Sequence, residues 1–133
     1  MLDNADVRII WVAELKANTV VLSGTSSGAT EIREKDWQGE DFSYPNIRVT
    51  ASVRPGQCLD DVDVIISYFS QQKSSKEAIV GQGIIAKQYH DKPFTRSNVR
   101  FAPLQVVSIP DATQAENGIW KADVILQMKA SAI

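Results

Sequence analysis

The sequence has few of the residues from which catalytic and metal sites are most often built. Among 133 residues it contains one histidine, His90, and one cysteine, Cys58. One cysteine excludes an intramolecular disulfide and also excludes zinc sites built from several cysteines. The glycines, among them Gly24, Gly28 and Gly81, do not follow the pattern of a phosphate-binding loop, so nucleotide binding is not expected.

The sequence also lacks long apolar runs and an excess of positive charge. The longest apolar run is only a few residues, so no membrane span is expected. The formal net charge of −2 argues against a non-specific grip on nucleic acid, which requires a basic surface. Residues 1–4 lack a basic stretch, so we expect no signal peptide and synthesis in the cytoplasm. A chain of 133 residues, 44% hydrophobic, is expected to form one domain over residues 1–133.

Two segments show helical periodicity. Residues 3–16 carry four apolar residues on one stripe and can be capped by Asp3 or Asn4; the four are Val7, Ile10, Trp11 and Leu15. A second helix is predicted from residue 76 to about residue 90, with Ser74 and Glu77 at capping-box spacing. Its expected core face consists of Ala78, Ile79, Gly83, Ile84 and Ala86. Gly81 and Gly83 each weaken a helix by about 1 kcal/mol relative to alanine, so we expect a close neighbour there.

Alternation of apolar and polar residues predicts the strands. It is clear over 47–53, 62–69 and 120–129, and a further strand is expected over 99–109, with Pro103 at an edge or bulge. Residues 30–42 are expected to form a short strand or an exposed loop, and residues 110–117 a polar loop. The sequence therefore predicts an α+β fold: a mostly antiparallel four- to five-stranded sheet with two helices packed on one face.

Two groups of residues are candidates for chemistry. Cys58 and His90 would form a nucleophile and base if they were adjacent, with Asp91 orienting the histidine. Asp60, Asp61 and Asp63 offer oxygen ligands for a hard cation, but their spacing does not match a calcium loop. The simpler interpretation is a half-buried cysteine, a solvated histidine and a solvated strand entrance. We therefore expect no catalytic, cofactor or metal site and no enzyme activity.

Aromatic residues suggest packing rather than ligand recognition. Basic residues lie near aromatic ones between positions 92 and 101, which is a weak pattern for nucleic-acid binding; the residues are Lys92, Phe94, Arg96, Arg100 and Phe101. Trp11 and Trp120 lie on predicted core faces. Trp37 lies in a charged stretch, where it either folds back on the sheet or meets a partner.

The order of these elements resembles the small tail-terminator or tail-completion (neck) proteins of tailed bacteriophages. The points of resemblance are the amphipathic N-terminal helix, the strand that starts at Tyr44-Pro45-Asn46-Ile47-Arg48-Val49, the segment from Asp63 to Ile85 and the Trp-led last strand. The resemblance implies a structural virion protein that forms a ring, commonly hexameric, at the head-proximal end of the tail tube. Such a ring would end tail polymerisation and join tail to neck, with residues 23–43 as a candidate subunit contact or lumen-facing arm.

The resemblance implies partners but no substrate. Tail tube and neck proteins would contact the ring, without membrane, small-molecule substrate or specific nucleic-acid binding. The alternative is a small monomeric or dimeric ligand-binding or regulatory α+β domain from a mobile element, with a pocket between helix and sheet. An enzyme that uses Cys58, His90 or the aspartates is the third possibility. Oligomer formation, ligand-induced stabilisation and loss of activity on substitution would distinguish the three.

Overall fold

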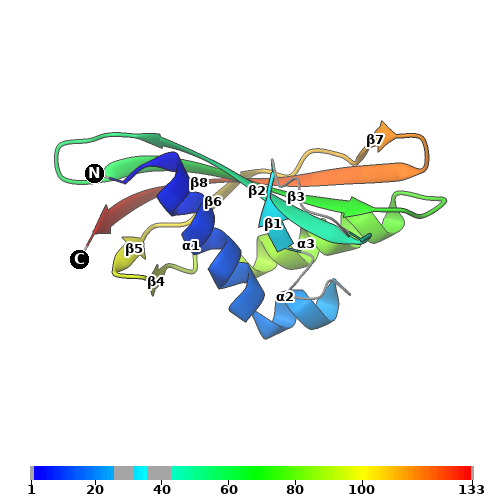
Figure 1. The fold of residues 1–133 in the computed structure, drawn as a ribbon, viewed down its shortest axis with the longest axis horizontal. Coiled ribbons are helices and arrows are strands. Elements are labelled where there is room, and N and C mark those ends of the chain that lie inside the picture. The colour runs from blue at the N-terminus through cyan, green and yellow to red at the C-terminus, as the bar shows by residue number, and fades with distance from the viewer. Residues whose placement is uncertain (1, 26–31, 36–42, 133) are drawn as a thin grey trace.

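The computed structural model describes residues 2–25, 32–35 and 43–132, and over these it contains three helices and eight strands (Figure 1). In chain order the elements are α1 (Asn4–Ala17), α2 (Thr19–Gly24), β1 (Ile32–Glu34), β2 (Asn46–Arg54), β3 (Asp60–Ser70), α3 (Lys76–Tyr89), β4 (Phe94–Arg96), β5 (Val99–Phe101), β6 (Gln105–Ser108), β7 (Thr113–Glu116) and β8 (Ile119–Ala132). The predicted α+β class is confirmed. The predicted four to five strands and two helices are too few.

The sheet is organised around the long strand β8. One edge of β8 pairs antiparallel with β3 from Trp120 to Ala130, and β3 pairs in turn with β2. The other edge of β8 pairs successively with the short strands β7, β6 and β5. β1 pairs parallel with β2, so the sheet is mixed and curled rather than purely antiparallel. Its order is β1-β2-β3-β8-β5-β4, with β6 and β7 beside β8.

Strict alternation in β3 and β8 places the core. In β3 the buried residues Val62, Val64, Ile66 and Tyr68 alternate with half-buried or polar ones. Those four stand opposite Met128, Leu126, Val124 and Ala122 of β8, which are buried as well. Because successive side chains point to opposite faces, one face of the sheet is apolar along its whole length. All three helices lie on that face in Figure 1.

Helix α1 follows the sequence prediction closely. Asp3 caps it, with a capping box formed between Asp3 and Asp6. The predicted stripe is the buried one, and Trp11 at its centre is fully buried. The Trp11 ring makes edge contacts with Tyr89 and Phe94, at centroid distances of 5.1 and 4.9 Å. These contacts attach α1 to the end of α3 and to the β4–β5 hairpin.

Helix α3 was predicted in the right place but with the wrong face and the wrong cap. Its N-cap is Ser75, which makes no side-chain cap hydrogen bond, so the predicted Ser74–Glu77 capping box is wrong. The buried residues are Ala78, Gly81, Gln82, Ile85 and Tyr89. Gln82 lies on the core face because its amide donates to the carbonyls of Pro110 and Asp123, at 2.8 and 2.6 Å. A polar residue satisfied from another segment cannot be recognised from helical periodicity alone.

Four further elements differ from the prediction. Residues 19–24 form α2, whose start is capped by the Asn18 side chain, which accepts from Val20 and Val21 N–H groups at 3.1 Å. The expected strand over 99–109 is two strands, β5 and β6, separated at Pro103. The expected polar loop 110–117 contains β7, which is exposed throughout but is held by pairing with β8. β4 was not predicted. The short strand expected within 30–42 is β1.

Candidate functional site

The face of the sheet opposite the helices is covered by no other described element, and it is lined with ion pairs. Arg54 on β2 pairs with Asp63 on β3, and Lys129 on β8 pairs with Asp61. Lys121 lies 3.6 Å from Asp123 on the same strand. The Ser67 hydroxyl donates to Asp123 at 2.6 Å. The strand register causes this arrangement, because it places residues of opposite charge on neighbouring strands.

The centre of this open face is apolar. Ile65 and Ile125 stand directly opposite each other in the β3–β8 register, and both are half-buried. Near one end, the Arg48 guanidinium lies over the Phe69 ring, 4.5 Å from its centroid. An apolar centre surrounded by polar groups has the anatomy of a small protein–protein contact surface.

The three aspartates at the entrance of β3 have separate structural partners. The two carboxylate oxygens of Asp60 accept the backbone N–H groups of Leu2 and Gly56, each at 3.2 Å. The hydrogen bond from Lys129 holds the pKa of the Asp61 carboxyl below its usual range. Asp63 accepts from Arg54, whose pKa this contact raises. No cluster of three histidine, cysteine, aspartate or glutamate side chains that could hold a metal occurs among the described residues.

Cys58 and His90 lie in different surroundings. Cys58 is exposed in the turn between β2 and β3, in a hollow that also contains Leu2 and Asp60. His90 follows the end of α3, where its Nδ1 accepts the N–H of Val106 at 3.1 Å. Its Nε2 lies 3.3 Å from a carboxylate oxygen of Asp91. The structure thus brings His90 and Asp91 together and gives His90 the role of attaching α3 to β6.

The basic and aromatic residues at 92–101 do not form one surface. Phe94 and Phe101 point into the core and stack at a centroid distance of 5.0 Å. The Nε of Arg96 lies 3.3 Å from Glu14, which also accepts from the Tyr89 hydroxyl at 3.1 Å. Trp120 is half-buried against the core. Trp37 and Gly28 lie outside the described residues.

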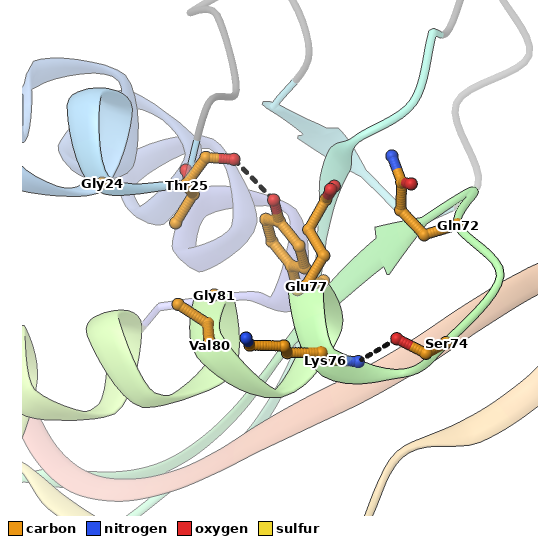
Figure 2. A pocket seen from close by; sticks show the side chains of 9 residues that line it. Gly24, Thr25, Gln72, Ser74, Lys76, Glu77, Val80 and Gly81 are labelled. Atoms are coloured by element: carbon orange, nitrogen blue, oxygen red, sulfur yellow. Dashed lines mark hydrogen bonds between the residues drawn. The ribbon is translucent and has the colours of Figure 1, made fainter.

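A pocket of about 390 Å³, lined by both polar and apolar groups, lies between the end of α2 and the first turns of α3 (Figure 2). Tyr68 is one of the residues that line the pocket, and its hydroxyl donates to the Thr25 carbonyl at 2.5 Å. Glu77 and Gln72 both line the pocket (Figure 2), and one carboxylate oxygen of Glu77 is buried without a hydrogen-bond partner among the described residues. The sequence suggested a pocket between helix and sheet, but the capping-box prediction assigned Glu77 to the helix start.

Several large apolar side chains are exposed. They are Ile9, Val20, Leu59, Ile79, Val80, Val107 and Ile109. Val107 and Ile109 lie beside the last turns of α3, where a hollow of about 630 Å³ is lined mostly by apolar side chains. The sequence analysis missed this surface because it placed Val107 in the interior of a strand. The break in alternation at Val106-Val107 was the available signal.

Comparison with known proteins gives a fold relationship. No protein-family model matches the chain, and no curated protein sequence matches it. Among solved structures, it resembles a chain of one described as the virion of a native gene transfer agent particle. The TM-score is 0.69 with 11% sequence identity, and the match covers 93% of each chain. None of the described helices is long and apolar enough to cross a membrane. At 11% identity the likeness establishes that the two chains share a fold over nearly their whole length.

Proposed function

We propose that the chain is a structural subunit of a phage-like virion. In the more specific form of the proposal, it forms a ring at the head-proximal end of a tail tube, ends tail polymerisation and joins tail to neck. The observation that carries the proposal is the shared fold with a chain of a gene transfer agent virion, over 93% of both chains. The element order that resembles tail-terminator proteins supports the same role.

The surface chemistry fits an assembly role. Among the residues that the structure describes, seven large apolar side chains are between 42 and 60% exposed, and some of them gather in hollows beside the sheet. Gathered, exposed apolar side chains are typical of contact surfaces between proteins. The ion-paired open face offers a further surface for the neighbouring components of a particle.

The proposal is tested by the mass of the purified chain in solution. Light scattering on a sizing column, up to high concentration, is expected to give a closed oligomer of about six subunits, visible as a ring by negative-stain microscopy. A strict monomer over the whole range would contradict ring formation. Antibody labelling of particles that contain the protein is expected to mark the junction between head and tail; labelling along the tail or at its tip would contradict the location.

The pocket in Figure 2 favours a second candidate function, a small ligand-binding domain. A buried carboxylate oxygen without a partner is costly, by about 1–3 kcal/mol for a polar group, and a bound ligand that donates to Glu77 would remove that cost. This candidate predicts a monomer that gains thermal stability with a polar or cationic ligand, and a Glu77→Gln variant that does not. A ring that forms equally well with Glu77→Gln would favour the assembly role.

A further inference from the structure

His90 is the only histidine of the chain, and it follows directly after the last residue of α3. Its backbone is fixed there, because the His90 N–H donates to the Ala86 carbonyl at 3.0 Å. Asp91 follows with a φ of 58°, a left-handed conformation that aspartate adopts more readily than most residues. The chain therefore turns sharply at a defined place, and this turn brings the imidazole of His90 to β6.

The two ring nitrogens of His90 have different partners. Nδ1 accepts the N–H of Val106 on β6 at 3.1 Å. Nε2 lies 3.3 Å from a carboxylate oxygen of Asp91. Because a backbone N–H only donates, Nδ1 must carry a lone pair, and the ring proton must be on Nε2, where the carboxylate can accept it. The two contacts therefore fit one protonation state, the neutral imidazole with its proton on Nε2.

Protonation of this ring would remove the acceptor on which Val106 depends. In an imidazolium both ring nitrogens are donors, so a proton on Nδ1 would face the N–H of Val106 with no acceptor between them. The contact of Nε2 with Asp91 suits both states of the ring, since a carboxylate accepts from either. Histidine is the side chain whose charge ordinarily changes between pH 5 and 8. The hydrogen bond to Val106 is therefore the contact that depends on pH.

Few charged groups lie beside the ring. Asp91 contributes the carboxylate, and Lys87 of α3 is the other charged residue that lines the same hollow as His90 among the described residues. β6 has no charged residue between Gln105 and Ser108. The His90 side chain is 51% exposed, so a proton can reach it directly from solvent. Protonation at this place requires no rearrangement of the core.

The middle of β6 depends on His90 more than its ends do. Before the strand, the Leu104 carbonyl accepts the backbone N–H of Asp91 at 2.9 Å, and after it the Pro110 carbonyl accepts from a glutamine amide of α3 at 2.8 Å. Neither hydrogen bond involves a group that titrates between pH 5 and 8. Between these two points, the pairing of β6 with β8 shifts register after Val106. Loss of the contact with His90 would therefore loosen the strand at Val106 while both ends stay attached.

We propose that His90 is a pH-sensitive switch between α3 and β6. The neutral ring holds the N–H of Val106, and protonation of Nδ1 releases it. The release leaves a free backbone donor on β6 and adds a positive charge to the hollow of about 630 Å³ that His90 lines together with Val106 and Val107. The shape and the charge of this hollow therefore both change with pH. Every group involved belongs to one copy of the chain, so the switch goes beyond the proposed ring and does not depend on it.

Nuclear magnetic resonance tests the switch, and a chain with one histidine has one set of ring signals to follow. At pH 8 we expect a single neutral tautomer, with the proton on Nε2 in the nitrogen-15 spectrum. Between pH 8 and pH 5, the protection of the Val106 amide against hydrogen exchange is expected to fall by about 2- to 10-fold, as for loss of one hydrogen bond, together with the change in the ring signals. The Asp91 amide, which donates to the Leu104 carbonyl close by, is the internal control and is expected to keep its protection.

Two substitutions of His90 give matched variants at one exposed position. The side-chain oxygen of His90→Asn can accept the Val106 N–H at any pH, so this variant is expected to keep Val106 protected at pH 5. His90→Ala removes the acceptor and is expected to leave Val106 poorly protected at both pH values.

Four results would each overturn the switch. They are a neutral ring with its proton on Nδ1, protection of Val106 that does not follow the titration of the ring, a His90→Ala variant as well protected as wild type, and an equal loss of protection at Asp91. The last result would mean that the whole end of α3 detaches at low pH. None of these readouts depends on the mass of the chain in solution, so failure of the switch and failure of the ring can be told apart.

Discussion

Helix α3 contains two glycines, Gly81 and Gly83, that are separated by one residue. Substitution by alanine is expected to have opposite effects on stability at the two positions. A Cβ at position 81 would lie 2.8 Å from the Cε1 and Cζ atoms of the Tyr68 ring. A Cβ at position 83 would meet nothing within 4 Å among the described residues outside its own helix. Gly81 is therefore required by close packing of α3 on the sheet, as the sequence analysis expected, whereas the same expectation for Gly83 is wrong.

The magnitudes follow from two effects. Alanine is favoured over glycine within a helix by about 1 kcal/mol, and this gain is the same at both positions. At position 81 the Tyr68 ring cannot move aside easily, since it is 1% exposed and its hydroxyl is held by the Thr25 carbonyl. Overpacking of this kind costs about 1–3 kcal/mol. We expect Gly83→Ala to be about 1 kcal/mol more stable than wild type, and Gly81→Ala to be about 1–3 kcal/mol less stable than Gly83→Ala.

Urea unfolding of the two variants, followed by circular dichroism, measures the difference. Because the propensity gain cancels between them, the difference in the free energy of unfolding isolates the contact with Tyr68. In thermal unfolding it corresponds to about 4 °C for each kcal/mol in a domain of this size. Equal stability of the two alanine variants would refute the reasoning, because it would mean that α3 does not approach the sheet closely at Gly81.

Three further predictions concern single side chains. Asp60→Ala removes the acceptor of two backbone N–H groups and is expected to cost about 1–3 kcal/mol in urea unfolding. Burial and a neighbouring carboxylate raise the pKa of Tyr89 above its ordinary value of about 10. Its contribution to stability is therefore complete below pH 10 and is lost as the pH rises above 10. Tyr89→Phe should flatten the fall in melting temperature between pH 10 and 12; an equally steep fall would contradict this. Trp11→Ala should cost about 3–5 kcal/mol, measured in the same urea assay, because Trp11 is fully buried among aromatic rings; a loss below about 1 kcal/mol would contradict its central place.

The local sequence pattern was sufficient to predict a helix or strand where one face of the element is apolar and the other is polar. Helix α1, strands β2 and β3 and the last strand β8 were predicted close to their observed bounds because their burial follows a strict period. In β8 buried residues alternate with half-buried or exposed ones from Ala122 to Ala130. The α+β class follows from these elements alone.

Pattern failed where a partner distant in the sequence decides the conformation. β7 is exposed throughout, so nothing in its own residues distinguishes it from a loop, and it is a strand because β8 offers an unpaired edge. The buried face of α3 includes Gln82 because two carbonyls from other segments accept its amide hydrogens. The exposed apolar surfaces that support the proposed assembly role also depend on contacts between segments that are distant in the sequence.

The sequence by itself determined the fold class, the position of the core strands and the absence of familiar catalytic motifs, because periodicity and residue type are local properties. The tertiary structure alone decided which exposed residues share a surface. Ile9 and Arg33 line one hollow because α1 packs against β1 and β2. Ala86 and Ile109 line another hollow because the hydrogen bond from the Val106 N–H to His90 attaches α3 to β6. Such contacts join residues separated by more than 20 positions, and no local pattern records them.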